Sequence, residues 1–111
     1  MYNTAIQGKN MSWASQYIEL LKNGKTVSFR PLGGSMTGRV ESGQLVTVSP
    51  VKDHQALKRG DIVLCQDGNA QYLHLIKRIS KGQFQIGNNK GKINGWVGFE
   101  GIFGKCINIQ V

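Results

Sequence analysis

The chain has few of the features that mark a membrane-spanning, exported or disordered protein. No segment approaches the ~18–20 consecutive apolar residues that cross a bilayer, and the N-terminus lacks a basic region followed by an apolar core. Only two prolines occur among 111 residues, while glycine is abundant, which favours short strands joined by turns over disorder. We expect a soluble, cytoplasmic protein of one domain with no membrane partner.

Cysteine is almost as scarce, with Cys65 and Cys106 only. Both fall in predicted strands, far apart and without Cys-x-x-Cys spacing, so we expect reduced, buried side chains. A disulfide or a metal site is the alternative. Adding His54 and His74 gives no ligand spacing typical of zinc, so we expect neither a metal nor another cofactor.

Acidic residues are also few: six, against fourteen lysines and arginines, for a formal net charge of +8. This balance would suit an acidic partner, but the positive charge is diffuse. We expect solvated loops, with nucleic acid or another polyanion as the alternative partner and Trp96 as a candidate stacking residue. The densest group of basic residues lies in or beside predicted turns: Lys81, Lys90, Lys92 and Lys105.

The chain divides into a short tail and a single domain. Residues 1–10 show no period and are expected to form a flexible tail, followed by a domain over residues 11–111. A helix is predicted over about residues 12–23, because Ser12 can cap it and Asn23-Gly24 can end it. Its apolar stripe is typical of a packing helix.

After Gly24 the pattern changes to short strands separated by Gly, Asn and Pro turns, over residues 26–111. The regular spacing favours a mostly β fold, a coiled and partly closed β-structure with one N-terminal helix. The predicted strands are Thr26–Arg30, Leu45–Ser49, Asp61–Gln66, Gln71–Ile79, Gln83–Gly87 and Gly101–Ile109.

A lysine occupies an apolar position in one of these strands. Side chains of a strand alternate between faces, so Lys77 shares a face with Leu73 and Leu75, while His74 falls on the more polar face, which we expect to meet solvent. Desolvation favours the neutral amine, which can act as a general base. The alternative is a lysine whose ammonium reaches water.

A serine that could use such a base follows two glycines. Gly33 and Gly34 permit positive φ and close backbone approach, so the turn can expose the Oγ and the N–H of Ser35. Serine is a poor nucleophile until a base takes its proton, and serine–lysine pairs do so in known hydrolases. An ordinary turn between strands is the alternative.

Four segments in order resemble the peptidase domain shared by LexA-type repressors and type I signal peptidases, over roughly residues 27–111. The resemblance implies the same mostly β fold. It departs at Gln44 and Asn88, where the family usually has acids, and at Thr37, where signal peptidases often have proline. The matching segments are the nucleophile turn 29–36 with strand 40–48, the strand 57–64, Lys77-Arg78-Ile79, and the closing segments 87–91 and 101–106.

The resemblance implies amide-bond hydrolysis by a Ser-Lys dyad, with Ser35 as nucleophile and Lys77 as base. The N–H of Ser35, assisted by the main chain of Gly33 or Gly34, would stabilise the oxyanion. Met36 would pack the nucleophile turn.

His74 is the rival base, since some relatives in this superfamily use histidine. Strand parity places His74 and Lys77 on opposite faces and so favours Lys77, unless a β-bulge lies between them.

The expected substrate is a peptide bond in this chain or in another cytoplasmic protein. The helix-turn-helix of a repressor is missing. The alternative function is a catalytically inactive β-domain of the same fold that binds nucleic acid or a protein partner. The oligomeric state is open, with a dimer as one option.

Overall fold

The computed structural model describes residues 3–6 and 12–111. These residues form one α-helix and eight strands, which confirms a mostly β protein with a single helix. Two short 3₁₀ turns, His54–Ala56 and Phe99–Gly101, join strands. The elements are β1 (Asn3–Ile6), α1 (Ser15–Lys22), β2 (Val27–Leu32), β3 (Val46–Pro50), β4 (Ile62–Asp67), β5 (Ala70–Ser80), β6 (Gln83–Gly87), β7 (Ile93–Gly98) and β8 (Ile102–Ile109).

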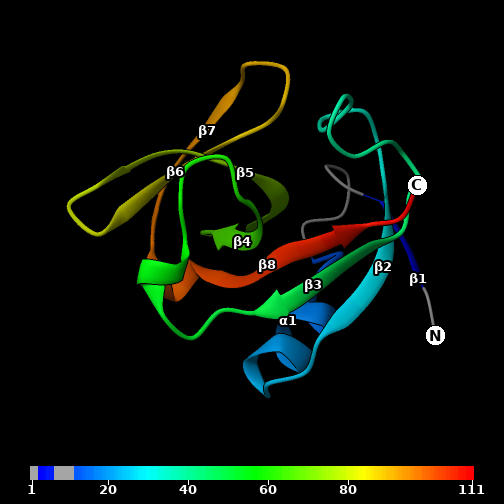
Figure 1. Ribbon diagram of the computed structural model, residues 1–111, viewed down its shortest axis with the longest axis horizontal. Helices are drawn as coiled ribbons and strands as arrows, with labels where there is room; N and C mark the ends of the chain where they lie inside the picture. The colour runs from blue at the N-terminus through cyan, green and yellow to red at the C-terminus, as the bar shows by residue number, and fades with distance from the viewer. Residues whose placement is uncertain (1–2, 7–11) are drawn as a thin grey trace.

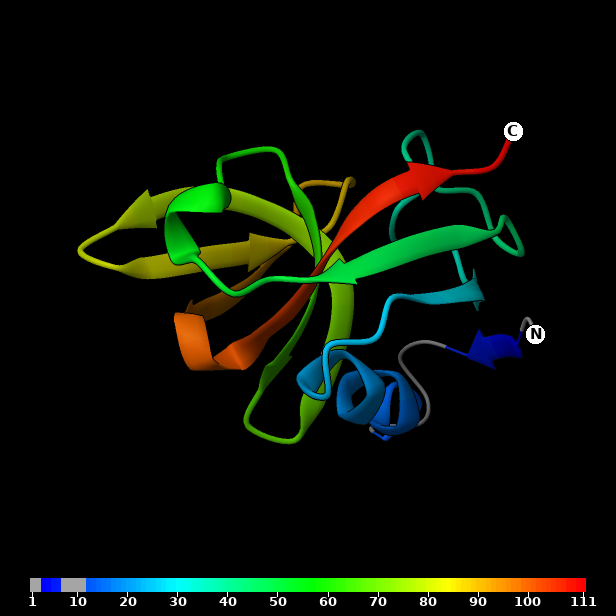
Figure 2. The same ribbon diagram turned by 60° about the horizontal axis from the view of Figure 1, so that its bottom comes forward.

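All eight strands belong to one sheet, in the order β1-β2-β3-β8-β4-β5-β6-β7. Every pair is antiparallel except β1 with β2, which is parallel. The sheet twists strongly, and α1 packs below β2, β3 and β8 (Figures 1 and 2). Since β1 and β7 form the two edges, the described strands do not close into a barrel.

The six predicted strands match β2, β3, β4, β5, β6 and β8, each to within two residues at both ends. Two strands were not predicted. β1 lies inside the predicted tail, and the rest of that tail falls outside the described residues. β7 contains Asn94 and Gly95, two residue types that are depleted in strands.

The helix begins later than predicted, and Ser12 is not its N-cap. The N-cap is Ala14, which has no cap from its own side chain. Its N–H instead donates to Oε1 of Gln71 at 2.8 Å, and the Trp13 indole donates to the Gln71 carbonyl at 3.1 Å. A residue of β5 therefore replaces the local cap and fixes the helix start beside that strand. The helix ends at Lys22 with Asn23 as its C-cap, and the next residue, Gly24, has a φ of +81°, which glycine adopts readily.

The central strands are buried on both faces. In β4, Leu64 belongs to the cluster under α1 while Val63 belongs to a second cluster, and both are fully buried. In β5, Leu73 and Ile76 divide between the same two clusters. The prediction that the His74 face of β5 meets solvent is therefore wrong, because His74 is only 5% exposed.

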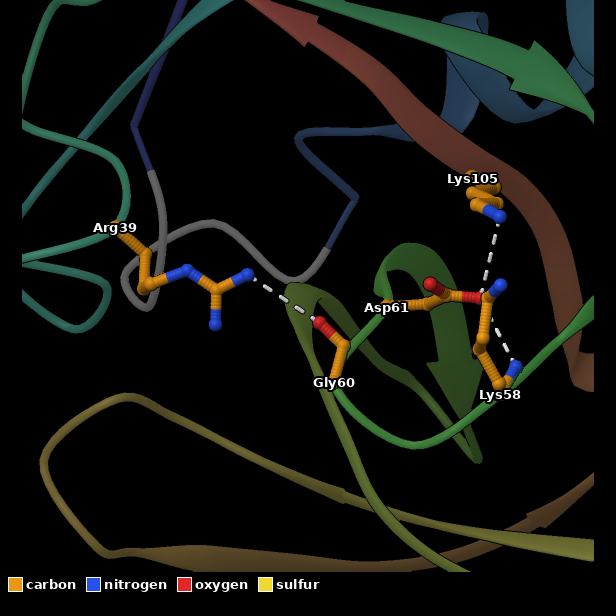
Figure 3. Close-up of polar contacts among 5 residues, drawn as sticks. All are labelled: Arg39, Lys58, Gly60, Asp61 and Lys105. Atoms are coloured by element: carbon orange, nitrogen blue, oxygen red, sulfur yellow. Dashed lines mark hydrogen bonds and ion pairs between the residues drawn. The ribbon is translucent and has the colours of Figure 1, made fainter.

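A polar cluster ties the turn after Ser35 to the loop that precedes β4 (Figure 3). The Arg39 guanidinium donates to the carbonyl of Gly60 at 3.3 Å. Asp61 accepts a hydrogen bond from the backbone N–H of Lys58 at 2.9 Å and pairs with Lys105 of β8 at 3.4 Å. The backbone N–H of Gly60 donates to the carbonyl of Ile76 in β5. This loop thus connects the serine turn with β5 and β8.

Both cysteines are free thiols, as predicted. Burial, together with the charge of the nearby Asp67, raises the pKa of the Cys65 thiol to about 12. Cys106 is only partly buried, against the prediction for both residues. In the described part of the chain, no helix is long and apolar enough to cross a membrane.

Candidate active site

Ser35 sits on a tight turn that leaves the end of β2. Gly33 has a φ of +114°, which side chains rarely tolerate, and its N–H donates to Oγ of Ser42 at 3.0 Å. Gly34 keeps an ordinary φ. Of the two glycines expected to permit a positive φ before Ser35, only Gly33 adopts one.

The residues after Ser35 anchor this turn in the core. Met36 and Val40 are each 3% exposed and belong to the cluster under α1. The N–H groups of Arg39 and Val40 both donate to the Met36 carbonyl, at 2.9 and 2.8 Å. Ser35 itself is partly buried. The burial of Met36 agrees with its predicted role of packing the turn and holds the serine at the edge of the core.

The partner of the Ser35 hydroxyl among the site residues is His74. Its Nε2 lies 3.2 Å from Ser35 Oγ, and its Nδ1 lies 2.7 Å from Oδ1 of Asn94 in β7. An amide oxygen only accepts hydrogen bonds, so Nδ1 carries the proton and donates it to Asn94. In the neutral ring Nε2 is then unprotonated and can accept the proton of Ser35.

The environment of His74 favours the neutral ring. Burial lowers the pKa of His74 below its ordinary value, and the charges of Lys92 and Lys77 lower it further, whereas the hydrogen bond to Asn94 raises it. The Tyr72 ring stacks on the imidazole, with centroids 4.9 Å apart and an angle of 21° between the ring planes. A neutral, oriented imidazole beside a serine hydroxyl has the form of a general base.

Lys77 lies close to this pair without joining it. Among the described residues, no hydrogen bond connects Lys77 to Ser35. Its aliphatic chain runs over Gly87, since a Cβ built on that glycine would lie 3.0 Å from both Cγ and Cε of Lys77. The expectation that Lys77 rather than His74 would face Ser35 is therefore not met by the geometry.

Two irregularities of the sheet account for this arrangement. The pairing of β5 with β6 shifts register at Lys77, and the pairing of β6 with β7 shifts beside Asn94. A bulge adds one residue to a strand, bends it and changes the direction of its side chains. Parity along β5 was therefore not a safe guide beyond Ile76, while the bulge in β7 is at the residue that contacts His74.

A pocket of about 230 Å³ opens in front of the pair. It is lined by the serine turn, by the first half of β5 and by the segment that joins β6 to β7, namely Gly33, Gly34, Ser35, Gln71, Tyr72, His74, Asn88, Lys92 and Asn94. In Figure 1 these are the loop after β2, strand β5 and the loop before β7. The side chains of Ser35 and His74 thus both line an open space of molecular size.

The segment between β6 and β7 is fastened to the serine turn. The N–H of Asn89 donates to the carbonyl of Ser35 at 3.0 Å, and its side-chain amide donates to the carbonyl of Thr37 at 2.9 Å. Oδ1 of the buried Asn88 accepts from the N–H groups of Lys90 and Lys92, at 2.8 and 3.0 Å. Asn88 therefore orders this loop through a side-chain oxygen that accepts hydrogen bonds, as the carboxylate of an acid at this position would also do.

One predicted oxyanion donor is already engaged. The N–H of Gly33 donates to Ser42, so it would have to leave that bond to bind an oxyanion.

Asn94 is the site residue that sequence reasoning missed. Because Asn94-Gly95 is a common turn pair, nothing local in the sequence distinguishes it from a loop residue.

Comparison of the chain with protein-family models and with curated proteins finds no match.

Proposed function

We propose that this protein is a serine hydrolase in which Ser35 is the nucleophile and His74 is the general base. The observation that carries the proposal is the continuous chain of hydrogen bonds from Ser35 Oγ through the imidazole to Asn94. Serine, histidine and an orienting amide or carboxylate, in this order, form the nucleophilic apparatus of several unrelated hydrolases. Asn94 holds the tautomer and ring orientation that the base requires.

The proposed reaction is hydrolysis of a peptide bond. Ser35 Oγ bonds to the carbonyl carbon while its proton moves to Nε2 of His74. The imidazolium then gives that proton to the leaving amine as the carbon–nitrogen bond breaks. Water then attacks the ester carbonyl while His74 takes one of its protons, and the imidazolium returns that proton to Ser35 Oγ as the carbon–Oγ bond breaks and the carboxylic acid product leaves. No metal or other cofactor takes part in these steps.

The resemblance to LexA-type and signal-peptidase domains supports a peptide bond as the target. In that superfamily histidine replaces lysine as the base in some members, which agrees with the position of His74. Lys77 is proposed to act on the base through its charge, because it lowers the pKa of His74.

The test is covalent labelling by a small, uncharged serine-directed probe at pH 8, read by intact mass. We expect one adduct at Ser35 that is absent in Ser35→Ala. Labelling of His74→Ala should be at least roughly 100-fold slower, the usual contribution of a general base. Lys77→Ala should still react. His54→Ala, which changes the other histidine, is the matched control.

The opposite pattern of labelling would assign the role of general base to Lys77 instead of His74. If folded His74→Ala reacts normally and folded Lys77→Ala does not, Lys77 is the base. If neither variant nor the wild type reacts, the chain is an inactive domain of this fold. Circular dichroism of each variant shows whether it is folded.

A further inference from the structure

Two lysines of the segment between β6 and β7 lie at the Ser35 pocket. Lys92 lines the pocket. The Nζ of Lys90 lies 3.6 Å from the point where Gly34 would carry a Cβ, beside the serine turn. Lys77 does not line the pocket: its aliphatic chain runs over Gly87, and its charge lowers the pKa of the pocket residue His74. The pocket therefore has a positive rim formed by Lys90 and Lys92.

No carboxylate lines this pocket; Glu41 lines a separate small cavity that Ser35 also lines, and its carboxylate accepts a hydrogen bond from the N–H of Gly38. None of the pocket-lining residues is acidic. Within residues 3–6 and 12–111, the ion pair that the structure shows is Lys105 with Asp61, away from the pocket. Asp67 approaches Gly95, the neighbour of Asn94, but does not line the pocket. Both charges that act on the pKa of His74 are positive, from Lys92 and Lys77.

The loop that carries Lys90 and Lys92 is ordered before any ligand arrives. Asn88 Oδ1 binds the N–H groups of both lysines, and the N–H of Asn88 donates to the Lys92 carbonyl at 2.9 Å. Asn89 ties the same loop to Ser35 and Thr37. A preformed loop saves ordering entropy on binding, so its two ammonium groups can select an anion near the nucleophile.

We propose that the pocket binds a peptide segment with an aspartate or glutamate side chain next to the bond that Ser35 attacks, and that Lys90 and Lys92 bind its carboxylate. This inference rests on the proposed function and names its substrate class. A peptide fits better than a nucleic acid, because Trp96 is 40% exposed but does not line the pocket and offers no stacking surface there.

Binding is measured with Ser35→Ala protein, which cannot turn the peptide over. Two fluorescent peptides are compared that are identical alanine-rich sequences except for a central glutamate or glutamine. We expect the glutamate peptide to bind roughly tenfold more tightly at low salt, with the difference shrinking as salt is added. Single-stranded oligouridylate is the competitor.

The decisive comparison uses two double variants of equal charge. Lys90→Gln/Lys92→Gln should reduce the glutamate preference to less than about twofold, since the carboxylate loses its charged partners. Lys22→Gln/Lys52→Gln removes the same two positive charges beyond the pocket and should keep the preference. Equal losses in both variants would show that the net charge alone attracts the peptide and would overturn the inference.

Other outcomes separate this inference from the hydrolase proposal. Labelling of Ser35 by the neutral probe without any glutamate preference overturns the substrate class and leaves the hydrolase. Glutamate preference without labelling keeps the acidic-peptide pocket and overturns the catalysis. Oligouridylate that binds through Lys90 and Lys92, where the glutamate peptide does not, assigns the pocket to nucleic acid and overturns the inference.

Discussion

The Nε2 atom of His74 lies 3.2 Å from the Oγ atom of Ser35, although 39 positions separate them in the chain. The serine follows β2 and the histidine lies in β5, and β3, β8 and β4 lie between these two strands in the sheet. Bending of the sheet and the bond between Asn89 and Ser35 bring the two segments together. The following predictions concern the residues that hold this contact.

The reaction rate should report the low pKa of His74. Only the neutral imidazole accepts the Ser35 proton, and burial lowers the pKa of His74 below 6.5, so labelling should persist below pH 6.5 and fall at more acidic pH. Lys92→Gln removes a charge that lowers this pKa and should move the acidic limb to higher pH. The pH dependence of the labelling rate measures both effects, with Lys52→Gln as the unshifted control. A limb that moves to lower pH in Lys92→Gln would contradict this assignment.

Asn94 should determine the orientation of His74 and its pKa separately. Asn94→Leu removes the acceptor for Nδ1–H, so labelling should slow by roughly tenfold. Asn94→Asp keeps an acceptor and adds a negative charge that stabilises the imidazolium, so its acidic limb should move to higher pH. The labelling rates of the wild type and of Asn94→Leu are compared at pH 8, well above the lowered pKa of His74 in the wild type. Equal rates for wild type and Asn94→Leu would mean that Asn94 does not position the base.

Gly87→Ala should displace the loop between β6 and β7 that lines the Ser35 pocket. The added Cβ would lie 2.5 Å from the Lys92 carbonyl oxygen and 3.0 Å from two carbons of Lys77, so the loop after β6 must shift. We expect both lower stability in urea unfolding and slower labelling of the protein that remains folded. Gly82→Ala in the β5–β6 hairpin is the control: its φ of +75° strains alanine, but no atom lies within 4 Å of the new Cβ. It should lose stability and keep its labelling rate.

Met36→Ala should loosen the serine turn. Met36 is 3% exposed, so its truncation leaves a cavity and should lower the free energy of unfolding by about 2–5 kcal/mol. Labelling of Ser35 should slow as well, because the hydrogen-bonded turn of residues 36–40 positions the serine. Leu20→Ala, at a residue that is 45% exposed, should change stability by less than about 0.5 kcal/mol. Unfolding in urea checks both values, and an equal loss in the two variants would contradict the anchoring role.

Much of the fold was predictable because its signals are local. Alternating apolar residues and the turns at Gly24, Gly33 and Gly82 define six of the eight strands. The two exceptions have local reasons: β7 is interrupted by Asn94-Gly95, and β1 is an edge strand whose parallel partner comes after the helix. The helix start was wrong because its cap is Gln71, a residue 57 positions from Ala14.

The sequence by itself determined the mostly β class, the glycine-dependent turn at Ser35 and the candidate set of Ser35, His74 and Lys77. Only the tertiary structure decided that the His74 side chain, and not that of Lys77, lies at hydrogen-bonding distance from Ser35, and it added Asn94 as a third residue. The physical reason is that strand alternation predicts side-chain direction only while the strand is regular and one face is solvated. Bulges at Lys77 and beside Asn94, and burial of both faces of β5, depend on pairing with β6 and β7, which no local pattern encodes.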